Sequence, residues 1–233
     1  MKGAASAAPF SFPVVSMPEH PLPPFASLVD SLLVAADEAL RSLSGAGSAA
    51  RSSPAAGLGD APASTTERDL SARLMRVNHT GEICAQALYS GQALVARSAE
   101  VRAALRSAAA EERDHLAWCR GRLHELDSRA SLLDPLWYAG SFAWGAASGL
   151  AGDAWSMGFL AETEEQVERH LEGHLERLPA SDAASRAIVE KMREDEARHG
   201  AAGRSLGGRE LPAPIKAAMR FASRVMTITA HWI

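Results

Sequence analysis

The stretch EERDH at residues 111–115 is matched by DEARH at residues 195–199, and each places a glutamate three positions before a histidine. Residues three apart in an α-helix lie on one face, so the two side chains of each pair point in the same direction. Apolar residues at helical spacing accompany both pairs, which places them toward a core. A charged glutamate in a core is unfavourable unless it is paired or binds a metal ion. The two stretches therefore predict helices that carry ligand groups inward: Glu112 with His115, and Glu196 with His199.

A lone glutamate precedes each ExxH stretch at nearly the same interval. Glu82 lies 30 residues before Glu112, and Glu164 lies 32 residues before Glu196. Glu164, rather than its neighbour Glu165, is expected to face inward because it shares a helical row with apolar residues. The chain is thus interpreted as a helical hairpin of the form E…ExxH that occurs twice.

Four carboxylates and two imidazoles from four helices form the ligand set of a ferritin-like di-iron or di-manganese site. Four carboxylates neutralise the charge of two divalent cations, and oxygen and imidazole ligands suit iron. Two surface Glu–His pairs on ordinary acidic helices are the alternative, but they do not account for the repeated interval. We therefore predict an all-α, ferritin-like four-helix bundle with an apolar crossover and an extra C-terminal helix. Its expected metal ligands are Glu82, Glu112, His115, Glu164, Glu196 and His199.

The composition agrees with an all-α protein. Of the 233 residues, 47% are hydrophobic and 6% aromatic, and β-branched runs bounded by turns are scarce. A net charge of −4 without a long basic run argues against nucleic acid as a partner. The two cysteines, Cys84 and Cys119, lack CxxC spacing, which argues against a disulfide framework or a zinc site and favours a reducing, cytosolic setting.

Proline, glycine and other small residues separate the expected helices. Residues 1–24 are Pro-rich and predicted to be disordered, 25–43 are predicted to form a short amphipathic helix, and 44–65 a flexible Ala/Ser/Gly/Pro linker. The ferritin-like domain is expected over 66–233. Periodicity and Pro or Gly breaks predict its helices at 67–97, 100–126, 154–178, 182–206 and from Pro212 to the C-terminus.

Residues 135–152, PLWYAGSFAWGAASGLAG, contain no charged side chain and are long enough to be a transmembrane candidate. A single crossing of the membrane would place the two halves of the four-helix site on opposite sides. We therefore expect the segment to be the crossover between the second and third bundle helices, covering one end of the bundle.

The last helix carries an apolar stripe flanked by cations. This pattern suits peripheral attachment to a membrane, although packing of the stripe on the bundle itself is an equally good interpretation. The stripe consists of Phe221, Val225, Ile228 and Trp232, and the flank of Lys216, Arg220 and Arg224.

Two further histidine patterns are assigned outside the ligand set. His79 precedes Glu82 by three residues, but Ala161 occupies the equivalent place before Glu164, so His79 is expected to orient a carboxylate rather than bind metal. HLEGH at residues 170–174 is expected to have a core or supporting role.

Several motifs together resemble the demethoxyubiquinol hydroxylase family, the di-iron monooxygenases of ubiquinone biosynthesis. They occur in order over residues 66–233: RVNHTGE at 76–82, ExxDHL at 111–116, PLW at 135–137, EE at 164–165 and DEARH at 195–199. The resemblance implies two Fe ions held by the six residues named above, and we expect Glu112 and Glu164 to bridge them. It also implies insertion of one atom of O₂ into the ring of a polyprenylated demethoxyubiquinol.

The resemblance further implies partners and a location. These are an electron donor such as NADH or a reductase, other ubiquinone-biosynthesis proteins, and the cytoplasmic face of a bacterial inner membrane rather than a mitochondrial one. Arg73, Arg76 and Arg224 are candidates for contacting the donor or lipid phosphates. The alternatives are another ferritin-like di-iron protein, active in iron oxidation, iron storage or peroxide detoxification, and a metal-free helical adaptor at the membrane.

Overall fold

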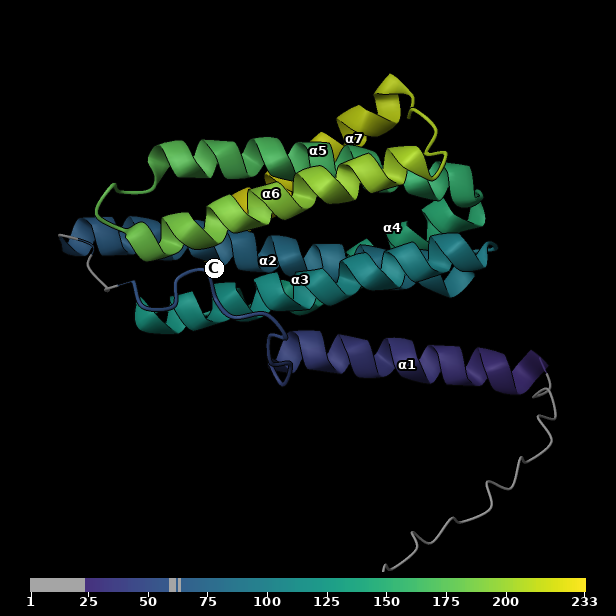
Figure 1. The fold of residues 1–233 in the computed structure, drawn as a ribbon, viewed down its shortest axis with the longest axis horizontal. Coiled ribbons are helices and arrows are strands. Elements are labelled where there is room, and N and C mark those ends of the chain that lie inside the picture. The colour runs from purple at the N-terminus through teal and green to yellow at the C-terminus, as the bar shows by residue number, and fades with distance from the viewer. Residues whose placement is uncertain (1–23, 59–61, 63) are drawn as a thin grey trace, which may run out of the picture.

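The structure, a computed structural model, describes residues 24–58, 62 and 64–233. Within these ranges the chain forms seven α-helices and no strand (Figure 1). The helices are α1 (Pro24–Ser44), α2 (Thr65–Val95), α3 (Ala99–Glu125), α4 (Asp134–Leu150), α5 (Asp153–Arg177), α6 (Ala183–Ser205) and α7 (Ala213–Trp232). The prediction of an all-α protein is confirmed, and the helix ends in the bundle agree with the predicted ones to within about two residues. The disorder predicted for residues 1–24 falls outside the described residues except at Pro24, where α1 begins.

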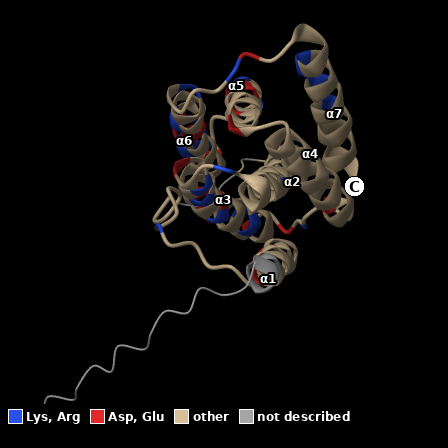
Figure 2. Cartoon of the chain, turned by 90° about the vertical axis from the view of Figure 1, so that its right-hand side faces the viewer, with Lys and Arg blue, Asp and Glu red and all other residues tan. Residues whose placement is uncertain are grey.

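Helices α2, α3, α5 and α6 form the predicted four-helix bundle, seen end-on in Figure 2. Short turns join α2 to α3 and α5 to α6, and α4 provides the connection between the two hairpins. Polar side chains cap three of the bundle helices: Ser64 accepts a hydrogen bond at the start of α2, Ser98 at α3 and Asp182 at α6. The two E…ExxH hairpins are therefore set side by side along their length.

Two apolar layers lie above and below the midpoint of the bundle. One contains Leu88 and Tyr89 of α2 with Leu105 of α3, and the other contains Met75 of α2 with Ile188 of α6. On each bundle helix, the predicted ligand residues come after the residues of one layer and before those of the other. The bundle thus holds its polar residues at mid-length and closes both ends with tightly packed side chains.

Helix α4 lies along the flank of α2, so the expectation that this segment covers one end of the bundle is wrong. Glycines explain the difference, because they let the two backbones touch. A β-carbon at Gly145 would overlap the backbone of Leu88, and one at Gly91 would overlap the backbone of Phe142. In the part of the chain that the structure describes, no helix combines the length and apolarity needed to span a membrane.

Helix α7 packs against α2 and α5 with one side and exposes the other. Met219 and Ala230 are buried, whereas Phe221 is 71% exposed and Trp232 65%. The apolar stripe predicted from the sequence is therefore the outward face of α7, and a different set of residues makes the contact with the bundle.

The histidines of HLEGH stack on each other in α5, with ring centroids 4.0 Å apart. Burial, followed by the charge of Arg177, lowers the pKa of His170 to about 4. Burial, followed by His170, lowers the pKa of His174 to about 2. Both imidazoles are consequently neutral at pH 7 and serve as part of the packing of α5.

Candidate metal centre

The bundle brings the six predicted ligands together at its midpoint, and all six are buried. They form two overlapping groups, and within each group one ligand atom from every residue lies within 4.8 Å of the others. The first group is Glu82, Glu112, His115 and Glu196. The second is Glu112, Glu164, Glu196 and His199. Four oxygen or imidazole donors per group match the requirement of a first-row divalent metal ion.

Glu112 and Glu196 belong to both groups, whereas Glu82 and Glu164 each belong to one. Glu112 and Glu196 are therefore the two carboxylates that the groups share, whereas the assignment of Glu112 and Glu164 as bridging carboxylates stays a prediction. The shared pair follows from the internal symmetry of the bundle. Each half of the bundle contributes the glutamate of its ExxH stretch to both ligand groups, and its lone glutamate to one group only.

Both histidines direct Nδ1 toward the carboxylates. Nδ1 of His115 lies 2.9 Å from Glu112 Oε2 and 3.3 Å from Glu196 Oε1. Nδ1 of His199 lies 3.1 Å from Glu112 Oε1 and 3.1 Å from Glu196 Oε2. The two imidazoles thus approach the shared carboxylates from opposite sides, as the two ends of a dinuclear site require.

The carboxylates of the centre suit a cation. Buried oxygens of Glu82 and Glu164 have no hydrogen-bond partner among the described residues, which is costly unless a metal ion supplies one. Burial, followed by the charge of Glu112, raises the pKa of Glu82 well above its ordinary value, and burial with Glu196 does the same for Glu164. Opposing burial, Glu112 and Glu196 raise the pKa of His199 to about 11. The site therefore strongly favours positive charge at its centre, and the residues present fit a pair of divalent metal ions.

A second carboxylate stands behind each histidine, contributed by the opposite hairpin. Asp195 Oδ2 lies 3.0 Å from Nε2 of His115, and Glu111 Oε2 lies 3.6 Å from Nε2 of His199. In the sequence these are the acids directly before the ExxH glutamates. Sequence reasoning missed them, although the repeated acid–Glu pair in EERDH and DEARH was the signal. Such partners fix the orientation of a metal-bound imidazole.

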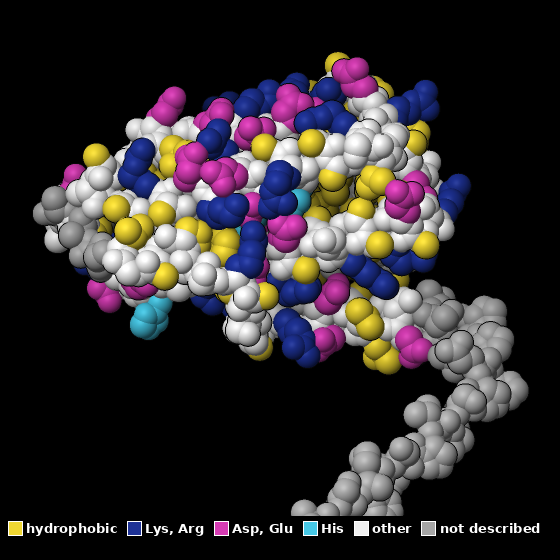
Figure 3. Space-filling view, viewed as in Figure 1, with side chains coloured by type: hydrophobic (Ala, Val, Ile, Leu, Met, Phe, Trp, Pro, Cys, Tyr) yellow, Lys and Arg dark blue, Asp and Glu magenta, His cyan; other side chains and the backbone are white. Residues whose placement is uncertain are grey.

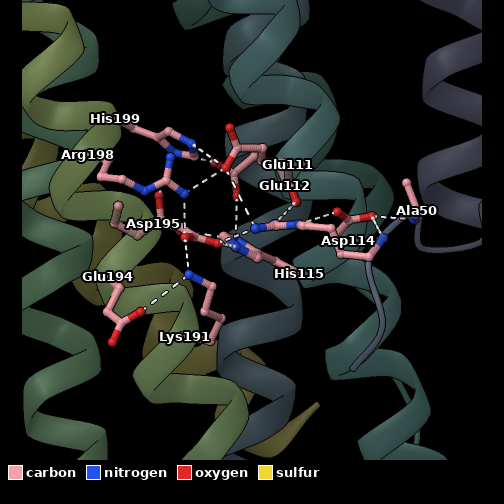
Figure 4. Close-up of polar contacts among 12 residues, drawn as sticks. Ala50, Glu111, Glu112, Asp114, His115, Lys191, Glu194, Asp195, Arg198 and His199 are labelled. Carbon is pink, nitrogen blue, oxygen red and sulfur yellow. Dashed lines mark hydrogen bonds and ion pairs between the residues drawn. The ribbon is translucent and has the colours of Figure 1, made fainter. Parts of the chain in front are cut away.

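Asp195 is fully buried and surrounded by cations (Figure 4). Lys191 lies 2.9 Å from its Oδ1, Arg198 contacts the same oxygen, and Arg51 lies 2.7 Å from its Oδ2. Burial would raise the pKa of Asp195, but hydrogen bonds from His115 and these three cations outweigh it and hold the pKa far below its usual range. Asp195 is therefore a buried carboxylate whose negative charge is stabilised by these partners.

Arg51 belongs to the segment of residues 45–58, here termed the strap, which passes over α3. Its Nε lies 2.5 Å from Asp114 Oδ2, and its guanidinium stacks 4.9 Å from the ring of Trp118. The backbone N–H of Ala50 donates to Asp114 Oδ1 at 2.6 Å. The strap thus differs from the flexible linker expected at 44–65. Its small residues have little to bury, but one arginine anchors it to carboxylates that composition does not reveal.

The protein also contains an apolar cavity of about 280 Å³, which none of the six ligand residues lines. Helices α2, α4, α5 and α7 line it, with Trp137 and Trp144 contributed by α4. Gly81 and Thr163, the sequence neighbours of Glu82 and Glu164, also line it. The helix turns that carry these two ligands therefore contribute to the wall of the cavity.

The remaining predicted residues lie away from the two ligand groups. His79 is buried with Nδ1 3.2 Å from Asp134 Oδ2, a contact that joins α2 to the start of α4, and its role in orienting a ligand carboxylate stays a prediction. Arg73 stacks 4.4 Å from the ring of Trp232. Arg76 donates to the backbone of Arg129 at 2.9 Å. Arg224 is exposed on α7.

Comparison with known proteins agrees with this architecture. Residues 69–230 match the family described as "Ubiquinone biosynthesis protein COQ7". The chain is similar to proteins named 3-demethoxyubiquinol 3-hydroxylase from three bacteria. That from Cupriavidus taiwanensis is 58% identical over 88% of this chain and 100% of its own, that from Bordetella pertussis 56% over 88% and 93%, and that from Nitrosococcus oceani 54% over 89% and 97%. With its repeated E…ExxH hairpin, its four-helix bundle and relatives matched over nearly their whole length, this chain belongs to the COQ7 family of ubiquinone biosynthesis proteins.

Proposed function

We propose that this protein is a di-iron 3-demethoxyubiquinol 3-hydroxylase. The observation that carries the proposal is the pair of ligand groups sharing Glu112 and Glu196, together with an apolar cavity whose wall includes the sequence neighbours of Glu82 and Glu164. The names of the relatives supply the substrate. Six buried donors on rigid helices provide the metal site, and the cavity provides room for an apolar ring.

The reaction takes one oxygen atom of O₂ into the ring as a hydroxyl group and reduces the other to water. Two electrons and two protons complete the balance, and the electrons come from a donor such as NADH or a reductase. Two iron ions held by the six ligands would supply the activation of O₂. The protein's own contribution is to neutralise the charge of the metal ions with four carboxylates, to hold the ring in place and to exclude water.

The cavity provides the position for the ring. Trp144 and Phe159 both line it and pack edge-to-face on each other with centroids 6.0 Å apart, and such rings suit contact with a quinol. Thr163 and Gly81, which precede Glu164 and Glu82 in the sequence, also line the cavity, so a ring held there would contact the helix turns that carry these two ligands. Helices α4 and α7 form its outer wall, so the isoprenoid tail would leave between them.

Helices α4 and α7 are also where the protein is expected to contact the membrane in which that tail resides. Phe221, Ile228 and Trp232 of α7 and Leu136 of α4 are all at least 55% exposed. Arg224 lies on the same helix and is placed to meet lipid phosphates. The face over α3 and α6 instead shows interspersed basic and acidic side chains (Figure 3), as expected of a surface in water.

Replacing both Phe221 and Ile228 by Glu is expected to abolish co-sedimentation with liposomes of bacterial lipids, because two charges would then have to enter the apolar interface. Leu40→Glu is the matched control, since Leu40 of α1 is 69% exposed and lies on another helix. Circular dichroism should show that both variants are folded. Release of the Leu40→Glu variant, with the α7 variant still bound, would place the contact on α1 and refute this assignment.

The rival functions predict different surroundings of the centre. Iron storage or peroxide detoxification requires a polar route for ions or peroxide, whereas the cavity here is lined mainly by apolar residues. A metal-free adaptor would have no need for four buried carboxylates, of which Glu82 and Glu164 each have an oxygen without a hydrogen-bond partner among the described residues. Both features favour the hydroxylase.

The proposed function is tested by deleting the gene in its host and profiling the quinones. Demethoxyubiquinone should accumulate, and the wild-type chain should restore ubiquinone. Glu112→Ala should not restore it, because Glu112 belongs to both ligand groups. Glu165→Gln, at an exposed position of α5 where the side chain pairs with Arg169, should restore it. A normal quinone profile in the deletion strain would refute the proposal.

A further inference from the structure

The strap reaches the outer carboxylates of the metal centre with a single side chain. Arg51 Nε lies 2.5 Å from Asp114 Oδ2, Nη1 lies 2.7 Å from Asp195 Oδ2, and Nη2 donates to the backbone oxygen of Glu111 at 3.4 Å. One planar guanidinium thus joins α3 to α6 at the level of the centre. The contact spans 144 residues of sequence between Arg51 and Asp195.

The two oxygens of Asp195 have different partners. Oδ1 receives Lys191 and Arg198, both from its own helix α6. Oδ2 lies 3.0 Å from Nε2 of His115 and also receives Arg51. Arg51 of the strap therefore holds Oδ2, the oxygen that contacts His115. Lys191 and Arg198 of α6 hold Oδ1.

We propose that Arg51 is a positioning residue for the metal centre: through Asp195 it fixes the ring of His115 and so secures the metal ion on the His115 side. The inference rests on the proposed function in requiring a bound metal. When Nδ1 of His115 binds metal, Nε2 carries the proton and donates to Asp195. The direction of that hydrogen bond depends on where Oδ2 lies, and Arg51 determines that place.

The two histidines of the centre differ in how closely an outer carboxylate contacts them. His199 has Glu111 at 3.6 Å from Nε2, a longer contact than the 3.0 Å between His115 and Asp195. Glu111 is paired with Arg198 at 2.9 Å, and Arg51 Nη1 lies 3.8 Å from it. Loss of Arg51 should consequently disturb the His115 side of the centre more than the His199 side.

The shape of arginine is essential to this role. A lysine supplies one point charge and cannot reach Asp114, Asp195 and the Glu111 carbonyl together, whereas the guanidinium presents its donors in a fixed plane. The stacking on Trp118, whose ring also lies 5.4 Å from that of His115, fixes the plane further. Charge alone should therefore not restore the function of Arg51.

The test uses the full-length, iron-loaded protein with Arg51→Met and Arg51→Lys. Iron release to a chelator is expected to become about 10- to 100-fold faster for one of the two ions, the range found when a metal-bound histidine loses its outer partner. Mössbauer spectra of ⁵⁷Fe-loaded protein should show one altered and one unaltered iron environment. Arg41→Met is the matched control, because the Arg41 side chain forms an exposed ion pair with Asp37 of its own helix α1.

A purely structural role for Arg51 would lower the melting temperature of the metal-free protein but leave both iron environments and release rates unchanged, and this result would overturn the inference. Equal changes at both irons would also overturn it. Asp114→Asn, which weakens the hold on Arg51 without altering Asp195, should give the same selective effect if Arg51→Met does not fold. If the wild-type protein itself takes up no iron, it is the proposed function that fails.

Discussion

Substitution of Glu196 by alanine is expected to remove both iron ions and to reduce hydroxylation by more than the roughly 100-fold that follows loss of an outer partner of a metal ligand. The reason is that Glu196 belongs to both ligand groups, with Oε1 3.3 Å from His115 Nδ1 and Oε2 3.1 Å from His199 Nδ1. Metal analysis of the purified protein, together with turnover of a short-chain demethoxyubiquinol, measures both effects.

Glu164→Ala provides the contrast, because Glu164 belongs to one group only. We expect this variant to retain close to one iron per chain while losing most of its activity. Glu165→Ala, at the exposed neighbouring position, should retain two irons and normal turnover. If Glu164→Ala lost both irons and Glu196→Ala only one, the roles of the two carboxylates would be the reverse of those inferred here.

Gly145→Ala is expected to push α4 away from α2 and to open the cavity. A single β-carbon at this position would overlap the backbone of Leu88, and a backbone contact cannot be relieved by a change of rotamer. The free energy of unfolding should fall by about 1–3 kcal/mol or more, as for other overpacked sites. The KM for demethoxyubiquinol should rise more than kcat falls, because Trp137 and Trp144 move with α4 while the metal ligands do not.

Gly121→Ala is the matched control for this change. Gly121 lies in α3 with open space around its missing side chain, so alanine there should raise stability by about 1 kcal/mol through its higher helix propensity. Chemical denaturation measures both variants. Equal stability of the two would show that the contact between α2 and α4 is looser than the structure indicates.

The placement of the six ligands was accessible from sequence because it depends on helical periodicity alone. An ExxH stretch puts its glutamate and histidine on one face in any helix, and the repeated interval to Glu82 and Glu164 shows which helices pair. Helix ends were accessible for a similar reason, since Pro and Gly breaks and polar caps act locally.

Features that depend on how the helices are rotated about their axes or docked on one another could not be predicted from the sequence. Whether Glu164 or Glu196 bridges depends on the rotation of α5 and α6 about their axes, which periodicity does not determine. The docking of α4 along α2 depends on backbone contact at Gly91 and Gly145, where the sequence shows only small residues. The role of Arg51 could not be predicted because its partners Asp114 and Asp195 are 63 and 144 residues away in the sequence. The composition of residues 44–65 carries no information about such distant contacts.

The long reach of Arg51 also bears on the order in which the protein is completed during synthesis. The strap emerges from the ribosome before α3, and its anchor Asp114 follows Arg51 by 63 residues, so the strap can settle on α3 early. Asp195 follows a further 81 residues on, which takes on the order of ten seconds at the usual rate of elongation. The contact between the strap and α6 can therefore form only after α6 has been synthesised, and α6 is also the helix that brings Glu196 and His199. Translation of α6 thus supplies Glu196, the last carboxylate of the centre, together with Asp195, the residue that Arg51 contacts.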